Sequence, residues 1–150
     1  MVIAQYGWLA MLAVVWVNVL LIRRRIRPHR EAFPELEPGY RRLIRGFALW
    51  MSLPWLVMGI GCMIGEVPTC FHFLFPLVGG PFVWAFWVVC FAEFLILGYW
   101  ALCRDGAETL VRHPGIVKYS IDSVREMRWM MVAGSAFGII WNAGFLIWIA

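Results

Sequence analysis

Charged residues are scarce in this sequence. They make up 15% of the 150 residues, and 63% of the residues are hydrophobic. A soluble domain has about a quarter of its residues charged, so most of this chain suits lipid better than water. The sequence therefore predicts one integral membrane domain over residues 1–150.

Patterns typical of catalytic and cofactor sites are also missing. The sequence has no GxSxG, no HExxH and no phosphate-binding loop, and its four cysteines form no CxxC pair. His29, His72 and His113 all fall outside the apolar stretches, so a pair of haem-ligating histidines is not expected. We therefore expect a protein that is not an enzyme and that holds no cofactor.

Four apolar stretches are each long enough to cross a bilayer. About 20 residues in a helix span a hydrocarbon core of roughly 30 Å. The stretches are residues 2–22, 46–65, 82–102 and 129–150. Only a helix satisfies its own backbone groups in lipid. The predicted fold is an all-α integral membrane bundle of four transmembrane helices.

Basic residues predict the orientation of this bundle. Eight of the thirteen Lys and Arg fall in residues 23–45, the other five fall in residues 103–128, and residues 66–81 have none. By the positive-inside rule, the two basic loops are cytoplasmic and both termini lie outside. Arg23 directly follows the first stretch with no cleavage site before it, so that stretch is expected to be retained.

Local signals divide the two basic loops. Three prolines are expected to break the first loop: Pro28, Pro34 and Pro38. After Pro38, a helix is expected to run directly into the second stretch. In the second loop, residues 107–113 predict one or two helical turns, and Ser123 with Glu126 has the spacing of a capping box at the start of the fourth helix.

Glu93 lies near the middle of the third stretch, with Cys90 one turn before it. A charged carboxylate is costly in lipid, so Glu93 is expected to face protein or water. Two interpretations stay open: a neutral Glu93 that hydrogen-bonds across the bundle, or a proton or cation site. Asn142 has a similar depth in the fourth stretch and is the expected partner. No other Asp, Glu, Lys, Arg or His lies within the four stretches.

Small residues predict close helix packing. Gly134 and Gly138 form a GxxxG pattern, and Gly61 and Gly65 repeat its spacing in the second stretch. Such pairs let another helix approach closely, either within the chain or from a second subunit.

Cys62, Cys70 and His72 gather around the loop that is predicted to face outward. Thiolate and imidazole are ligands that suit soft metal ions, but the spacing matches no metal motif, so no metal site is expected. A disulfide between Cys62 and Cys70 is the alternative, since this loop faces outward.

Four arginines follow the first stretch: Arg23, Arg24, Arg25 and Arg27. Beside a bilayer, such a cluster binds anionic lipid headgroups or simply anchors the orientation of the span, and the two roles are compatible. The net charge of +4 does not indicate nucleic-acid binding, because the basic residues flank predicted membrane spans.

Residues 53–61 (LPWLVMGIG) and 106–115 (GAETLVRHPG) resemble those of a family of small bacterial four-helix membrane proteins with no assigned activity. The resemblance implies a multi-pass protein of the bacterial inner membrane and brings no catalytic residues. We expect a non-enzymatic subunit that assembles with itself or joins a larger membrane complex. The alternative is a proton or cation channel or carrier in which Glu93 is the titrating site.

Overall fold

The computed structural model describes residues 2–77 and 79–149, which contain helices and no strand. In chain order the elements are α1 (Val2–Gln5), α2 (Gly7–Ala32), η1 (Pro34–Leu36), α3 (Glu37–Met63), η2 (Cys70–Leu74), α4 (Pro81–Cys103), α5 (Gly106–Arg112) and α6 (Val124–Ile149). Among the described residues, three helices are long and apolar enough to cross a membrane, namely α3 with the preceding η1, α4 and α6. The chain is therefore an all-α bundle suited to a membrane.

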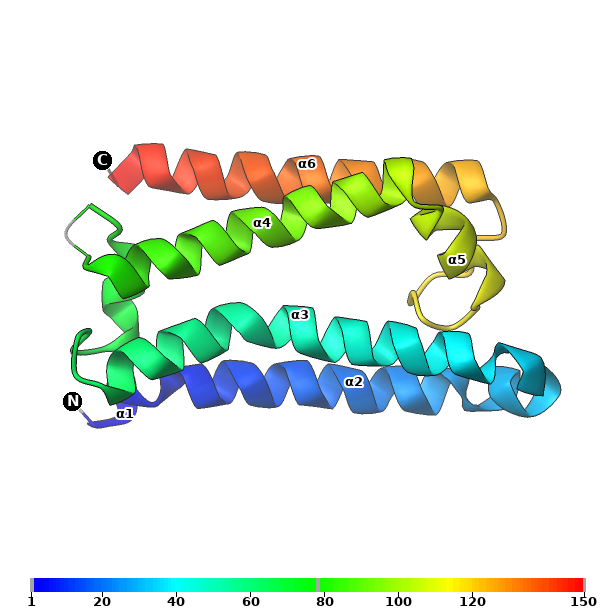
Figure 1. Cartoon of the computed structure of the whole chain (residues 1–150), viewed down its shortest axis with the longest axis horizontal. Coiled ribbons are helices and arrows are strands. Elements are labelled where there is room, and N and C mark those ends of the chain that lie inside the picture. The colour runs from blue at the N-terminus through cyan, green and yellow to red at the C-terminus, as the bar shows by residue number, and fades with distance from the viewer. Residues whose placement is uncertain (1, 78, 150) are drawn as a thin grey trace.

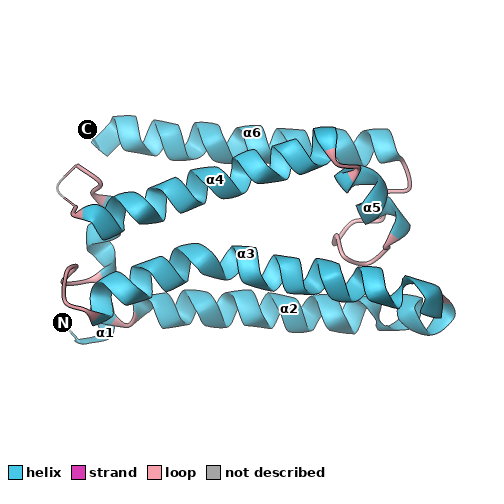
Figure 2. Ribbon diagram, viewed as in Figure 1, coloured by secondary structure: helices cyan, strands magenta, loops and turns pink. Residues whose placement is uncertain are grey.

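Two helical hairpins make up the bundle. In Figure 1, α2 lies along α3, and α4 lies along α6. Figure 2 shows that loops occur almost only at the two ends of these hairpins. We call the end that holds α1 and η2 the terminal end, because α6 also finishes there, and the end that holds η1 and α5 the basic end.

The hairpins meet through α3 and α4, most closely at the terminal end. A Cβ atom added at Gly61 of α3 would lie 3.0 Å from the Cβ of Phe82 of α4. Further from that end, the rings of Trp55 and Phe86 lie 6.0 Å apart. Toward the basic end, α3 and α4 diverge (Figure 1).

The first predicted stretch differs from the observed helix at both ends. A bend at Tyr6 separates α1 from α2, and α2 continues past Ile22 to Ala32. The prediction that Pro28 breaks the chain is wrong, because Pro28 lies inside α2. Proline removes the helical bond to the carbonyl of Arg24, but both residues are exposed, so water can satisfy that carbonyl.

Other local predictions are confirmed. The helix α3 starts with Pro38 in its first turn and runs unbroken to Met63. The predicted turns at residues 107–113 correspond to α5. At the start of α6, the hydroxyl of Ser123 accepts a hydrogen bond from the backbone N–H of Glu126 at 3.4 Å.

The predicted spans 46–65, 82–102 and 129–150 correspond to α3, α4 and α6, except that residue 150 lies outside the described residues. The helix α2, which carries the first predicted span, is not one of the three that qualify. Its residues 7–22 are uncharged, whereas residues 23–32 of the same helix include several arginines. A fourth crossing by α2 stays a prediction.

Candidate functional site

Glu93 lies in the middle of α4 with a half-buried side chain. Its Oε1 atom is enclosed by protein and has no hydrogen-bond partner among the described residues. An enclosed polar atom without a partner is costly, which makes Glu93 a candidate functional residue. Cys90, one turn earlier, is also half-buried and packs against apolar residues of the terminal end.

Asn142 does not serve as the partner of Glu93 within the chain. Its Nδ2 donates to the carbonyl oxygen of Gly138, one turn earlier in α6, at 2.6 Å. The reason lies in how α4 and α6 meet. A Cβ atom added at Gly138 would overlap the ring of Phe94, the residue after Glu93.

The residues Phe94 and Gly98 mark the face of α4 that contacts α6. An added Cβ at Gly98 would meet the Cβ of Ser135 at 3.5 Å. Because neighbouring residues on a helix point about 100° apart, Glu93 is turned away from this contact. Glu93 and Asn142 therefore lie at a similar depth in the bundle, but Glu93 is not on the face of α4 that contacts α6.

The four predicted packing glycines have different roles. Gly138 lets α6 approach Phe94, and Gly61 lets α3 approach Phe82 and the ring of Phe73. Gly134 is exposed and an added Cβ there would meet nothing within 4 Å, so it makes no close packing contact with the part of the chain that the structure describes. Gly65 has a φ of +81° just after α3, so its role here is the turn that follows the helix.

The structure brings two of the three weak metal candidates together. The Sγ atoms of Cys62 and Cys70 lie 3.8 Å apart, and both cysteines are unpaired. His72 is exposed, and its Nδ1 lies 2.9 Å from the hydroxyl of Thr69. Within residues 2–77 and 79–149, no group of three His, Cys, Asp or Glu residues is placed to hold a metal ion.

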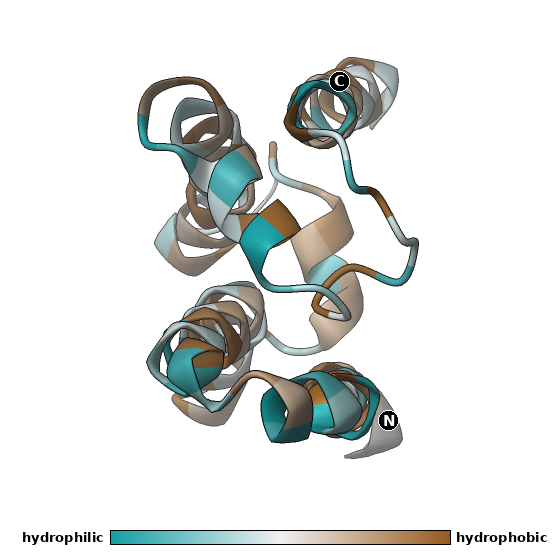
Figure 3. Ribbon diagram, turned by 90° about the vertical axis from the view of Figure 1, so that its right-hand side faces the viewer, coloured by the Kyte–Doolittle hydropathy of each residue, from teal (hydrophilic) through white to brown (hydrophobic). Residues whose placement is uncertain are grey.

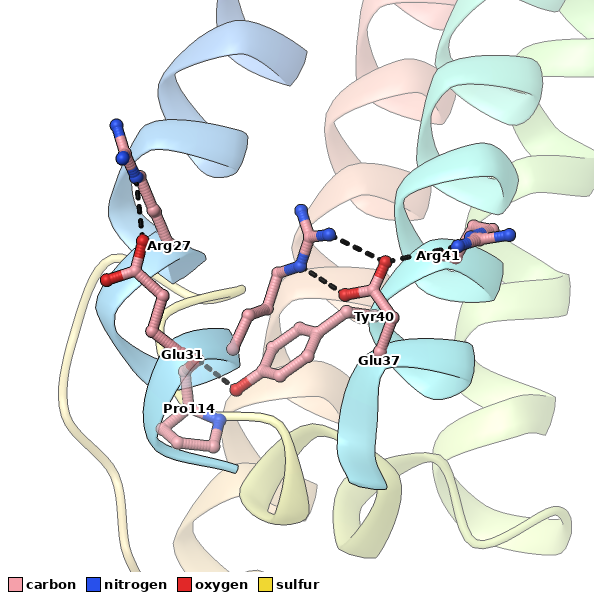
Figure 4. Close-up of polar contacts among 7 residues, drawn as sticks. Arg27, Glu31, Glu37, Tyr40, Arg41 and Pro114 are labelled. Atoms are coloured by element: carbon pink, nitrogen blue, oxygen red, sulfur yellow. Dashed lines mark hydrogen bonds and ion pairs between the residues drawn. The ribbon is translucent and has the colours of Figure 1, made fainter. Parts of the chain in front are cut away.

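The basic end gathers hydrophilic residues from the helix ends and loops (Figure 3). Glu37 forms an ion pair with Arg30 and another with Arg41, the latter at 3.4 Å. Figure 4 shows Glu37 between its partners. Arg27 pairs with Glu31 at 2.9 Å. Arg23, Arg27, Arg30, Glu31, Pro34 and Glu37 line an open groove.

Members of the predicted arginine cluster differ in their contacts. Arg25 donates to the carbonyl of Gly115 at 3.4 Å, and Arg27 is held by Glu31. Arg23 and Arg24 are exposed and make no ion pair within the described part of the chain. These two side chains are therefore free to contact anionic groups.

Sequence reasoning missed the contact that joins the hairpins at the basic end. The buried Tyr40 of α3 donates its hydroxyl hydrogen to the carbonyl of Pro114 at 2.9 Å (Figure 4). Its ring meets that of His113 edge-on, with centroids 5.0 Å apart. Gly39 makes room for the same imidazole, since an added Cβ would overlap it. Nothing in the sequence indicated that Pro114 and Gly115, which follow the predicted turns at residues 107–113, contact the first hairpin.

Asn18 is a second residue whose role the sequence left undefined. It lies on the exposed face of α2, and its amide donates to the carbonyl of Val14 in the same helix at 2.9 Å. The available signal was an amide side chain within an apolar stretch that also holds Gln5. That signal does not tell which way the side chain of Asn18 points, because the exposed face of α2 depends on where α3 packs.

Comparison with known proteins does not assign a family or a function to this chain. No protein-family model, curated protein or solved structure matches the chain.

Proposed function

We propose that this chain is a non-enzymatic membrane subunit that assembles with itself or joins a larger complex in a bacterial inner membrane. The observation that carries the proposal is the outward-facing amide of Asn18, which bonds only to its own helix among the described residues. Asparagine in a lipid-facing position favours a hydrogen bond across to another helix.

The surface around Asn18 is suited to helix packing. Val14, Val17 and Leu21 are exposed on the same side of α2. Dispersion contacts and interhelical hydrogen bonds drive association in lipid, because the hydrophobic effect contributes little between helices there. Gly134, which has open space above it on α6, offers a second place where a helix of another chain can approach.

The test is the composition of the particle extracted from its native membrane in mild detergent, measured by native mass spectrometry. We expect several copies of this chain, or a fixed ratio to a larger partner. Asn18→Leu should weaken the association about five- to thirty-fold, which corresponds to a loss of roughly 1–2 kcal/mol.

The matched control is Asn142→Leu. Asn142 also donates to a carbonyl of its own helix, but its side chain is half-buried within the chain. It should leave the association unchanged. A particle that contains one copy of the chain and no partner would contradict the proposal, as would equal effects of the two substitutions.

The second candidate function is a proton or cation conduit in which Glu93 is the titrating site. The half-exposed carboxyl of Glu93 favours it, because an ionisable group without a partner in the middle of an apolar helix can take up a proton or ion. Flux into vesicles that contain the protein should fall with Glu93→Gln and not with Glu66→Gln, which changes an exposed acid. Flux no greater than in empty vesicles would exclude the conduit.

The proposal includes four crossings, with the basic end in the cytoplasm and both termini outside. The distribution of Lys and Arg supports this orientation. Single cysteines at Glu66→Cys and Ser120→Cys, in a background without the native cysteines, test it because both positions are exposed at opposite ends. We expect an impermeant maleimide to label the first in intact cells and the second only after lysis.

Anionic lipids are the proposed partners of the basic end. Arg23 and Arg24 have no acidic partner in the described residues and directly follow the uncharged part of α2, where headgroups would lie. The resemblance of residues 53–61 and 106–115 to small bacterial membrane proteins supports an inner-membrane location.

A further inference from the structure

Two cysteines meet where three segments of the terminal end converge. Cys62 belongs to the last turn of α3, and Cys70 begins η2. Their Sγ atoms lie 3.8 Å apart. A disulfide bond is about 2.05 Å long. The two Sγ atoms would therefore need to move closer by less than about 2 Å, which rotation of the side chains can supply.

Hydrogen bonds to backbone carbonyls hold the two cysteines in this position. The N–H of Val67 donates to the carbonyl of Gly61 at 3.1 Å and closes the turn between the cysteines. The side chain of Gln5 donates to the carbonyl of Cys62 at 3.2 Å, while the thiol of Cys70 lies 3.6 Å from the carbonyl of Gln5. The pair is therefore built into the fold, because each cysteine is tied to the same residue of α1.

The two thiols differ in accessibility. Cys62 is 0% exposed and belongs to an apolar cluster with Met58 and Phe73. Cys70 is only half-buried. A reagent in solution would therefore reach the sulfur of Cys70 before that of Cys62.

We propose that Cys62 and Cys70 form a thiol–disulfide exchange site, in which Cys70 reacts with an external disulfide and Cys62 resolves the product. The thiolate of Cys70 attacks one sulfur of the external disulfide, which forms a mixed disulfide and releases one thiolate. The thiolate of Cys62 then attacks Sγ of Cys70, closes the internal bond and releases the second thiolate.

Protons and electrons balance in this sequence. The two cysteine thiols lose two protons, which pass to the two released thiolates. The cysteine pair loses two electrons, and the external disulfide gains them. In the reverse direction, an external thiolate attacks the accessible Cys70 and Cys62 leaves. The site is independent of assembly and of membrane orientation, so it goes beyond the function proposed above.

The test uses the purified full chain and oxidised glutathione as the probe. Cys103 is exposed and would react by itself, so the parent protein carries Cys90→Ala and Cys103→Ser. Intact mass spectrometry should show this parent losing two hydrogen atoms and retaining no glutathione. Adding Cys62→Ala should trap one glutathione on Cys70, and adding Cys70→Ala should leave the protein unmodified.

The asymmetry between these two variants is the decisive readout. Both replace a cysteine by a small side chain, and equal helical circular dichroism confirms that each one is folded. A parent that keeps glutathione or its two thiols would overturn the proposal. Glutathione bound as readily by the Cys70→Ala variant as by the Cys62→Ala variant would also overturn it, because Cys62 would then be the accessible thiol.

Discussion

The two ends of the bundle join the same two hairpins by different means. At the terminal end a single apolar cluster takes residues from both hairpins: Met58, Cys62, Val67, Phe73, Val83, Phe86 and Trp87. The ring centroids of Phe73 and Phe86 lie 5.4 Å apart, and the indole N–H of Trp87 donates to the carbonyl of Phe73 at 2.9 Å. One shared core thus fixes this end.

At the basic end each hairpin has its own apolar cluster. Val19, Ile22, Ile26, Tyr40 and Ile44 form the cluster between α2 and α3. Ala101, Ala107, Met127 and Met131 form the cluster of α4, α5 and α6. The loop after α5 connects the two, through the bonds to the carbonyls of Pro114 and Gly115. At this end, polar contacts and the packing of Ile116 and His113 from one loop take the place of a core shared by both hairpins.

The largest effect is expected from Phe73→Ala at the terminal end. Phe73 is fully buried between the hairpins, and removal of a buried aromatic ring costs about 3 kcal/mol or more. Unfolding in mixed micelles, followed by tryptophan fluorescence, measures the free energy of unfolding.

Phe71→Ala is the matched control, because Phe71 lies in the same η2 and is 63% exposed. It should change the free energy of unfolding by well under 1 kcal/mol, on the order expected for a surface position. Equal losses for the two variants would mean that the terminal end is not held by the shared core.

A smaller effect is expected from Tyr40→Phe at the basic end. This substitution keeps the buried ring against His113 and removes only the hydrogen bond to Pro114. The loss should be about 1 kcal/mol, typical of one such bond. Tyr119→Phe, at a residue that is 66% exposed, is the control and should have no effect in the same unfolding assay. A loss as large as that of Phe73→Ala would remove the distinction between the two ends.

Local sequence signals predicted most of the helix positions, because long apolar stretches and turn residues act over short distances. The boundary at Pro28 failed because the cost of a proline inside a helix depends on whether its freed carbonyl meets water. The extension of α2 to Ala32 therefore depends on its surroundings in the fold, which the sequence alone does not give.

The sequence predicted how deep in the bundle Glu93 and Asn142 lie, but not which faces of their helices they occupy. Counting residues along α4 and α6 places Glu93 and Asn142 at similar levels. Which faces meet depends on the packing of Phe94 over Gly138, a contact between segments far apart in sequence. The same limit applies to Gly134 and Gly138, since one faces outward and the other packs inside. The proximity of Cys62 and Cys70 was anticipated by the alternative of a disulfide, because the two residues are only eight positions apart in the sequence.

The smallest effect is expected from Arg128→Gln. Arg128 of α6 pairs with Glu108 of α5 at 2.9 Å, and the two side chains are 42% and 31% exposed. Such a pair contributes less than about 1 kcal/mol, and added salt should reduce that contribution further. Arg27→Gln, which breaks the more exposed pair with Glu31, is the control and should change stability even less. Both residues of the Arg128–Glu108 pair belong to one hairpin. Loss of this ion pair should therefore leave the contact between Tyr40 and Pro114, which joins the two hairpins, intact. The opposite outcome is that Arg128→Gln destabilises the protein as much as Tyr40→Phe does, even at high salt. The ion pair would then help to hold the contact between Tyr40 and Pro114. The basic end would in that case depend on α5 being held against α6.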